Sequence, residues 1–112
     1  MELAELSIDG WELEDGEACH AAAPATFEIP AASERHWLQP GQLVKLMFRI
    51  ALLDGDGKES EHTERMWVIV EGHAGAFYIG TLDNDARCTD DFKAGIKLAF
   101  APRHVIQIWR QS

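Results

Sequence analysis

The stretch Leu43-Val-Lys-Leu-Met-Phe-Arg-Ile-Ala-Leu-Leu53 opens the apolar core of this chain. Lys45 and Arg49 interrupt it at a spacing that places both on one face of a strand, because successive side chains of a strand point to opposite faces. Residues 54–57 (Asp-Gly-Asp-Gly) are of types that tolerate the positive φ values of tight turns. The pattern therefore predicts a strand over residues 43–53 that ends in a turn.

Four further segments, residues 65–71, 76–82, 96–100 and 105–109, are predicted to be strands because they are rich in β-branched or aromatic residues between turn residues. Trp67 lies in the most apolar of them and is predicted to be a buried core anchor. Residues 59–64 are charged and are predicted to be loose, and Ser33 is predicted to cap a short helix that runs through Leu38. The expected fold is mainly β (α+β), a small curved antiparallel sheet or partly open five-stranded barrel with one short helix.

The length of 112 residues predicts a single domain with one modest core. Residues 1–25 form an acidic segment that is hard to interpret, either a strand or a short helix docked by Trp11, and residues 26–110 form the β core. No apolar run approaches the length that spans a bilayer, and the acidic N-terminus lacks the pattern of a secretory signal. We therefore expect a cytoplasmic protein.

The net charge of −9 is concentrated in the first third of the chain. Residues 1–34 hold nine acids and no Lys or Arg, whereas the remaining residues hold ten acids and ten bases. Direct binding to nucleic acid or to an anionic membrane is disfavoured, because both require clustered Lys and Arg. A basic protein partner, met by Glu12, Glu14, Asp15 and Glu17, is one interpretation. The other is a solvated segment that only keeps the protein in solution.

No metal or cofactor site is predicted. Cys19 and Cys88 are 69 positions apart in sequence and belong to no Cys-x-x-Cys pair, and the five histidines show no His-x-x-x-His spacing. The acidic turns lack the spaced oxygen ligands of a calcium loop. In the expected compartment both cysteines are predicted to be free thiols.

Four motifs resemble those of an uncharacterised family of small bacterial proteins over roughly residues 26–108. These are an Arg-x-x-Leu-x-x-Gly opening, a Met-Trp-Val strand, a Gly-x-Leu-Asp-Asn turn and a Phe-x-Pro-x-His-Val-Ile close. They correspond here to Arg35, Leu38 and Gly41; Met66, Trp67 and Val68; Gly80, Leu82, Asp83 and Asn84; Phe100, Pro102, His104, Val105 and Ile106. The family's turn usually carries Pro two residues after the Asn, where this chain has Ala86. The resemblance implies an immunity protein that neutralises a toxin.

Asp83, Asn84 and His104 are the best candidates for a polar site. Asp83 and Asn84 either bind a ligand or accept hydrogen bonds from main-chain amides in their turn. His104 acts either as a general base or as a partner of a nearby main-chain carbonyl. Trp37 or Trp109 is predicted to be partly exposed, and both are candidates for a partner-binding surface.

Two classes of function remain open. The first is a non-catalytic protein-binding module, an immunity or regulatory protein that uses its acidic segment and exposed tryptophans. The second is a small hydrolase or ligand-binding enzyme with Asp83, Asn84 and His104 at one end of the barrel, although no nucleophile elbow or phosphate loop supports it. A plain accessory domain is a third possibility.

Overall fold

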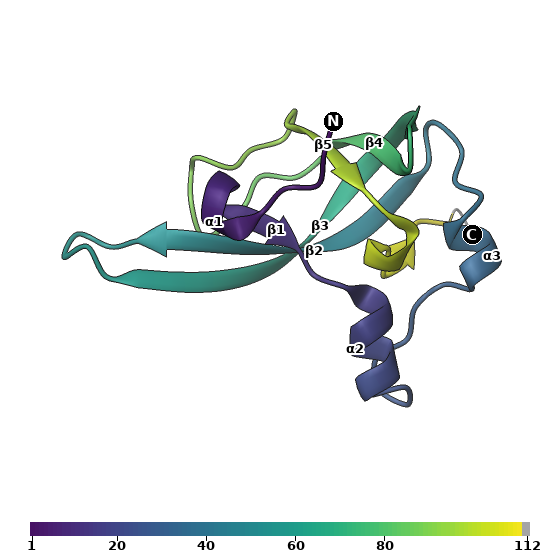
Figure 1. Ribbon diagram of the computed structural model, residues 1–112, viewed down its shortest axis with the longest axis horizontal. Helices are drawn as coiled ribbons and strands as arrows, with labels where there is room; N and C mark the ends of the chain where they lie inside the picture. Colours follow the sequence, from purple (N-terminus) through teal and green to yellow (C-terminus); the bar gives the residue numbers. More distant parts are fainter. Residues whose placement is uncertain (111–112) are drawn as a thin grey trace.

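A computed structural model describes residues 1–110 as a curled, half-barrel antiparallel sheet with a few short helices (Figure 1). The strands run in the order β1-β2-β3-β4-β5, and β6 pairs with β2 beside β1. The predicted α+β fold with a small curved antiparallel sheet is thus confirmed. The strands are β1 (Trp11–Leu13), β2 (Leu43–Leu53), β3 (Glu59–Ala74), β4 (Phe77–Leu82), β5 (Lys97–Phe100) and β6 (Gln107–Ile108). The helices are α1 (Leu6–Asp9), α2 (Gly16–Ala22), α3 (Ala32–Arg35) and the 3₁₀ turn η1 (Pro102–His104).

The hairpin of β2 and β3 dominates the sheet and extends beyond the rest of the molecule at the left of Figure 1. β2 has the predicted bounds, but β3 begins at Glu59 rather than at Arg65. Residues 59–64, which were predicted to be loose, continue the strand because their main chain pairs with β2 as far as Leu53↔Glu59. Main-chain hydrogen bonds need no apolar side chains, so the charged sequence did not prevent pairing.

Two short strands share the other edge of β2. β1 pairs with it from Trp11↔Ile50 to Leu13↔Phe48, and β6 pairs with it at Val44↔Ile108 and Lys45↔Gln107. The predicted strand over residues 105–109 is therefore only two residues long, because η1 turns the chain immediately before it. The acidic segment contributes β1 directly to the sheet.

The core lies on the concave side of the curled sheet. Even-numbered residues of β2 and β3 point into it, among them Val44, Phe48 and Val68, which are fully buried. The rings of Trp11, Phe48 and Phe92 form an aromatic cluster with centroids 5.1–5.7 Å apart. Residues 83–95 and the acidic segment therefore close the core where the sheet is open.

The prediction that Trp67 is a core anchor is wrong. Met66 and Val68 are buried, so the alternation of the strand places Trp67 on the opposite, outer face, where it is only half-buried. There the Lys45 ammonium lies 4.7 Å from the centroid of the indole ring. The short run Met66–Val70 is apolar at every position. The sequence therefore did not reveal whether its odd-numbered or its even-numbered residues face the core.

The helices differ from the prediction in number and in their starts. α3 spans Ala32–Arg35, and its N-cap is Ala31 rather than Ser33, with no side-chain capping bond. Residues 1–25 contain both a strand and helices rather than one or the other, and Asp15 caps α2 by accepting a hydrogen bond from the Ala18 N–H at 3.0 Å. Across residues 1–110, no helix has the length and apolar character needed to cross a membrane.

Candidate functional site

Arg35, the first residue of the motif series, is a buried structural clamp. Its guanidinium donates to the carbonyls of Pro30 at 2.9 Å and Pro102 at 3.1 Å, and it forms an ion pair with Glu17. The Tyr78 hydroxyl donates to the Arg35 carbonyl at 3.1 Å and accepts from the Leu38 N–H at 3.2 Å. This part of the opening motif thus holds α2, α3 and η1 against the sheet.

Asn84 also has a structural role, but its side chain bonds to the main chain of β3 rather than to its own turn. Its Oδ1 accepts a hydrogen bond from the Trp67 N–H at 2.5 Å, while the Asp83 N–H donates to the Trp67 carbonyl at 2.9 Å. Together they satisfy both main-chain groups of Trp67 beyond the last β3–β4 pair, Val68↔Leu82. The Asp83 carboxylate remains exposed.

His104 is buried and accepts a hydrogen bond at Nδ1 from the Ala101 N–H at 2.9 Å. The predicted carbonyl partner is therefore wrong, since the ring accepts from an amide instead. Burial lowers the pKa of His104 to about 4, and Arg103 adds to the effect, whereas Asp15 and Glu17 oppose it. Within residues 1–110, no hydrogen bond or ion pair joins His104 to Asp83 or Asn84. The polar candidates are thus held by separate main-chain partners.

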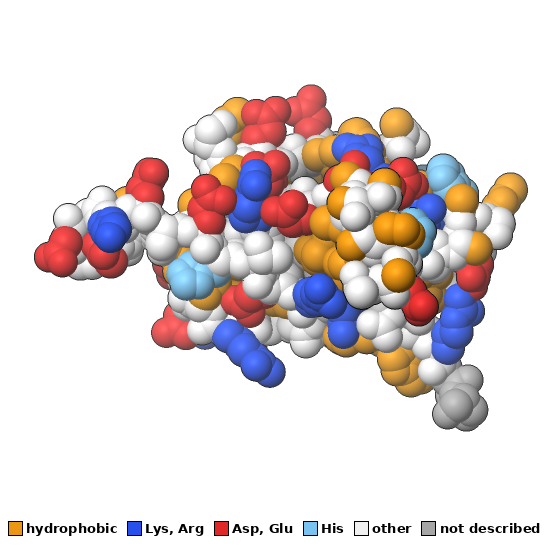
Figure 2. Space-filling view, turned by 90° about the horizontal axis from the view of Figure 1, so that it is seen from below, with side chains coloured by type: hydrophobic (Ala, Val, Ile, Leu, Met, Phe, Trp, Pro, Cys, Tyr) orange, Lys and Arg blue, Asp and Glu red, His pale blue; other side chains and the backbone are white. Residues whose placement is uncertain are grey.

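The four acidic candidates all face arginines of the same chain. Arg49 lies 2.9 Å from Glu12 and 3.5 Å from Glu14. Asp15 lies 3.9 Å from Arg103, and Glu17 pairs with Arg35. On the face drawn in Figure 2, basic side chains accordingly lie among the acidic ones.

The exposure expected for Trp37 or Trp109 is found at both residues, whereas their role in partner binding stays a prediction. Trp37 is 77% exposed just after α3, and Trp109 is 52% exposed just after β6. Both side chains are available on the surface, although no aromatic contact joins them within residues 1–110.

The long strand β3 has an open edge that the sequence did not reveal. The N–H and C=O of Trp67 point away from β2, because Asn84 and Asp83 take them on the other side. Main-chain groups alternate in direction along a strand, so those of Arg65, Thr63 and Glu61 also point away from β2. No partner for them exists among residues 1–110, because β4 pairs with β3 only from Val68 onward.

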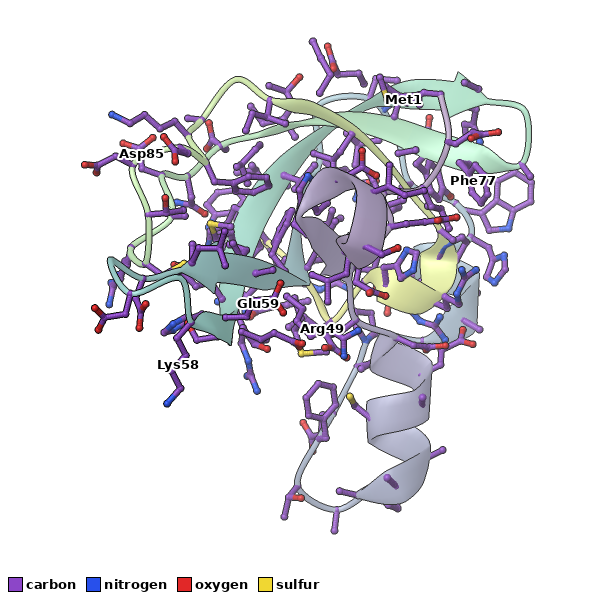
Figure 3. All side chains as sticks on the ribbon, turned by 60° about the vertical axis from the view of Figure 1, so that its left-hand side comes forward. Met1, Arg49, Lys58, Glu59, Phe77 and Asp85 are labelled. Atoms are coloured by element: carbon purple, nitrogen blue, oxygen red, sulfur yellow. The ribbon has the colours of Figure 1, made fainter. Side chains whose placement is uncertain are left out.

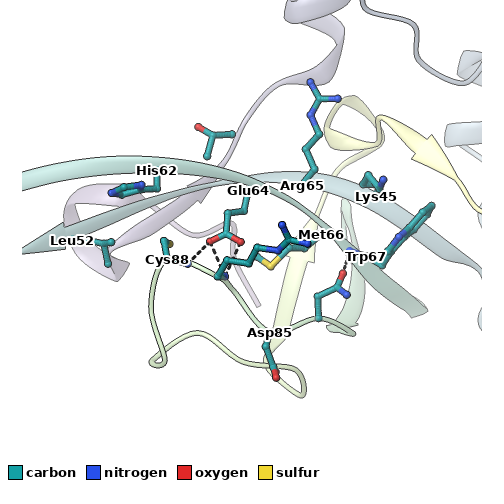
Figure 4. A pocket seen from close by; sticks show the side chains of 12 residues that line it. Lys45, Leu52, His62, Glu64, Arg65, Met66, Trp67, Asp85 and Cys88 are labelled. Carbon is teal, nitrogen blue, oxygen red and sulfur yellow. Dashed lines mark hydrogen bonds between the residues drawn. The ribbon is translucent and has the colours of Figure 1, made fainter.

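A groove of about 800 Å³ runs along this edge, between β3 and the loop that follows β4 (Figure 4). In Figure 3, Glu59 marks the hairpin and Asp85 marks the loop. Side chains from both faces of β3 reach the groove, because Glu64 points toward Cys88 while Arg65 points to the other side. The groove residues used below are Lys45, Thr63, Glu64, Arg65, Trp67, Asn84, Asp85, Arg87 and Cys88.

The two acidic groups of the groove accept hydrogen bonds from main-chain amides. The Glu64 carboxylate accepts from the N–H of Arg87 at 2.8 and 3.0 Å and from that of Cys88 at 2.9 Å. Burial disfavours its ionised form, but these hydrogen bonds outweigh the effect and lower the Glu64 pKa. Asp85 Oδ1 accepts from the Ala94 N–H at 3.0 Å. Burial and the neighbouring Glu64 raise the pKa of Cys88 to about 11, so its thiol stays protonated at neutral pH.

The three cations of the groove form no close ion pair across residues 1–110, although the charge of Arg87 helps to lower the Glu64 pKa. Lys45 lies over the Trp67 ring, and the Arg65 guanidinium lies 5.5 Å from the centroid of Phe27. Neither they nor Arg87 come within 4.0 Å of a carboxylate oxygen in the part of the chain that the structure describes. The groove lining therefore holds three cations and two carboxylates, on a protein that is acidic overall.

Comparison with protein-family models, with curated proteins and with solved structures gave no significant match. The family resemblance inferred from the motifs therefore stays a prediction. No three His, Cys, Asp or Glu side chains gather closely enough within residues 1–110 to hold a metal ion.

Proposed function

We propose that this chain is a non-catalytic protein-binding module whose interface is the open edge of β3, from Glu61 to Arg65. The observation that carries the proposal is the combination of unpaired main-chain groups at that edge with a groove beside it. Exposed strand edges are templates for another strand, and several classes of binding domain use them to capture extended peptides. An immunity or regulatory protein could act in this way by occupying a segment that its target needs.

The enzyme alternative has less support. Asn84 and His104 each bond to a main-chain amide, and His104 is buried with its Nδ1 already occupied. A general base needs a free lone pair directed at a substrate or a water molecule. These contacts favour structural roles for both residues.

The acidic segment is a weaker candidate interface than the edge of β3. Glu12, Glu14, Asp15 and Glu17 are engaged by arginines of the same chain, so a basic partner would compete with these ion pairs. A partner at the groove would displace no ion pair of Lys45, Arg65 or Arg87 within residues 1–110. A role for Trp37 and Trp109 in partner binding remains compatible with both versions.

Panning a display library of random twelve-residue peptides against the full chain tests the proposal. Thr63→Pro removes an outward N–H and leaves the β2–β3 hydrogen bonds intact, because those are made by even-numbered residues. Leu53→Pro is the matched control, since it removes an outward N–H on the opposite edge of the same hairpin. We expect enriched peptides to bind wild type and Leu53→Pro, but not Thr63→Pro. Absence of enrichment, or equal binding to all three proteins, would contradict the proposal.

A further inference from the structure

We propose that the occupant of the open β3 edge is an extended acidic segment of another protein, which adds to the sheet as an antiparallel strand. This inference rests on the proposed function and specifies the chemistry of its partner. It follows from three features: the direction of the free main-chain groups, the charges in the groove, and the face on which each side chain lies.

The main chain sets the length and the register of the segment. Arg65, Thr63 and Glu61 alternate with residues that bond to β2, so their free groups repeat every second residue. In an antiparallel ladder, hydrogen-bonded pairs alternate with non-hydrogen-bonded ones, and the two residues of a hydrogen-bonded pair exchange both N–H···O=C bonds. Three such pairs require a segment of about five residues, a length that short peptides match. Asn84 blocks extension at the end of the edge near Trp67, because it already occupies the Trp67 N–H.

The cations that form no close ion pair, above all Lys45 and Arg65 on the outer face, favour an acidic segment. Arg65, Lys45 and Arg87 line the groove and have no carboxylate within 4.0 Å across residues 1–110, whereas Glu64 and Asp85 already accept hydrogen bonds from amides. An acidic side chain would gain attraction from the cations without displacing an existing ion pair. The total charge of −9 offers no long-range attraction to such a segment, so its affinity must come from contacts in the groove.

The alternation of the strand places the acids at every second position. In a hydrogen-bonded antiparallel pair, the two side chains lie on the same face of the sheet. The residues opposite Arg65 and Thr63 therefore share the outer face with Lys45 and Trp67. The residues between them face Glu64 and Met66, where a second carboxylate would be repelled and an apolar side chain fits. The expected pattern is acid, apolar, acid, apolar, followed by a neutral residue opposite Glu61.

The peptide acetyl-Val-Glu-Val-Glu-Val-Thr-amide carries this pattern and is the probe. One control peptide replaces both glutamates by glutamine, and a second carries N-methyl groups on both glutamates, which keeps the charges but removes the N–H donors toward β3. Binding to the full chain is followed by NMR titration and by hydrogen exchange of the Thr63 and Arg65 amides. We expect a dissociation constant of roughly 1 mM or lower, together with protection of both amides.

We expect about tenfold weaker binding of the glutamine peptide and no binding of the N-methylated peptide. The double variant Lys45→Gln/Arg65→Gln removes the two cations of the outer face and should lose about fivefold for the glutamate peptide and nothing for the glutamine peptide. Lys58→Gln/Lys93→Gln, which lies outside the groove lining, is the matched control for net charge and should change neither affinity.

Several outcomes would overturn the inference. If the glutamine peptide binds as well as the glutamate peptide, or if library peptides that depend on Thr63 are neutral or basic, acidic selection is wrong while the binding edge stands. If the peptide-free protein is a dimer in solution with Thr63 and Arg65 protected, the occupant is a second copy. If neither the probe nor any library peptide binds, the inference and the proposed function both fail. If Thr63→Pro fails to fold, the N-methylated peptide still tests whether binding requires main-chain hydrogen bonds to β3.

Discussion

Arg35 on α3 and Glu17 on α2 form an ion pair in which the arginine side chain is 6% exposed and the glutamate side chain is 46% exposed. The same guanidinium donates to the carbonyls of Pro30 and Pro102, so one side chain joins the acidic segment, the loop before α3 and η1. Part of the charge excess of the acidic segment is thereby used to neutralise a buried cation. This relationship leads to the first prediction.

Arg35→Ala should destabilise the protein by about 3 kcal/mol, because the part-buried carbonyls of Pro30 and Pro102 lose their donor and Glu17 loses its ion-pair partner. The free energy of unfolding in urea is the measurement. Arg110→Ala removes an exposed arginine that pairs with Glu34 on the surface and serves as the control, with an expected cost of about 0.5 kcal/mol or less. Equal losses in the two variants would show that the burial of Arg35 is unimportant.

His104 should make stability depend on pH between about 4 and 6.5. Its pKa falls from 6.5 to about 4 on folding, so between these values the unfolded chain binds more protons than the folded one. The contribution is fully present above the unfolded pKa and is lost as pH falls toward the folded pKa, by roughly 3 kcal/mol in total. Unfolding free energies at several pH values measure it.

His104→Asn supplies the comparison for this titration. The asparagine oxygen can accept from the Ala101 N–H in place of Nδ1 but does not titrate, so the dependence on pH should flatten while the hydrogen bond is kept. His36→Asn changes an exposed histidine and should leave the slope as in wild type. An unchanged slope in His104→Asn would assign the acid sensitivity to the carboxylates instead.

Cys88 should react slowly with iodoacetamide at pH 8, because its pKa of about 11 leaves very little thiolate. Glu64→Gln should raise the rate several-fold, since the nearby negative charge and its hydrogen bond to the thiol are removed. Mass spectrometry of the peptide that contains Cys88 gives the rate. Glu61→Gln lies on the same strand beside Arg49 and is the control, for which the rate should not change.

Gly80→Ala should cost about 1–3 kcal/mol, because a Cβ there would lie 2.6 Å from Val68 Cγ1 and 2.7 Å from the Ile69 carbonyl oxygen. The second contact is with main chain, so side-chain rotation cannot relieve it. Gly72→Ala is the matched substitution on the paired strand, where a Cβ would meet nothing within 4 Å, and it should be tolerated. The thermal midpoints of both variants are the measurement. A Gly80→Ala protein as stable as wild type would show that the main chain of β3 does not pack closely on Gly80.

Local patterns in the sequence were sufficient to predict the β elements that have a clear apolar alternation. β2 has its predicted bounds because polar residues mark its outer face and a Gly-rich turn ends it. The role of Asn84 as a partner of a main-chain amide was among the predicted alternatives, since its short side chain suits that purpose.

Tertiary structure alone decided the orientation of Trp67 and the location of the open edge of β3. The apolar run around Trp67 would allow either its odd-numbered or its even-numbered residues to face the core. The register that pairs Lys45 with Trp67 places both side chains on the outer face. The open edge depends on where β4 stops pairing, and that point is set by Asn84 reaching Trp67 across 17 residues of sequence. Main-chain pairing leaves no mark on side-chain composition, so the charged residues 59–64 resemble a loop in the sequence although they form the first six of the sixteen residues of β3.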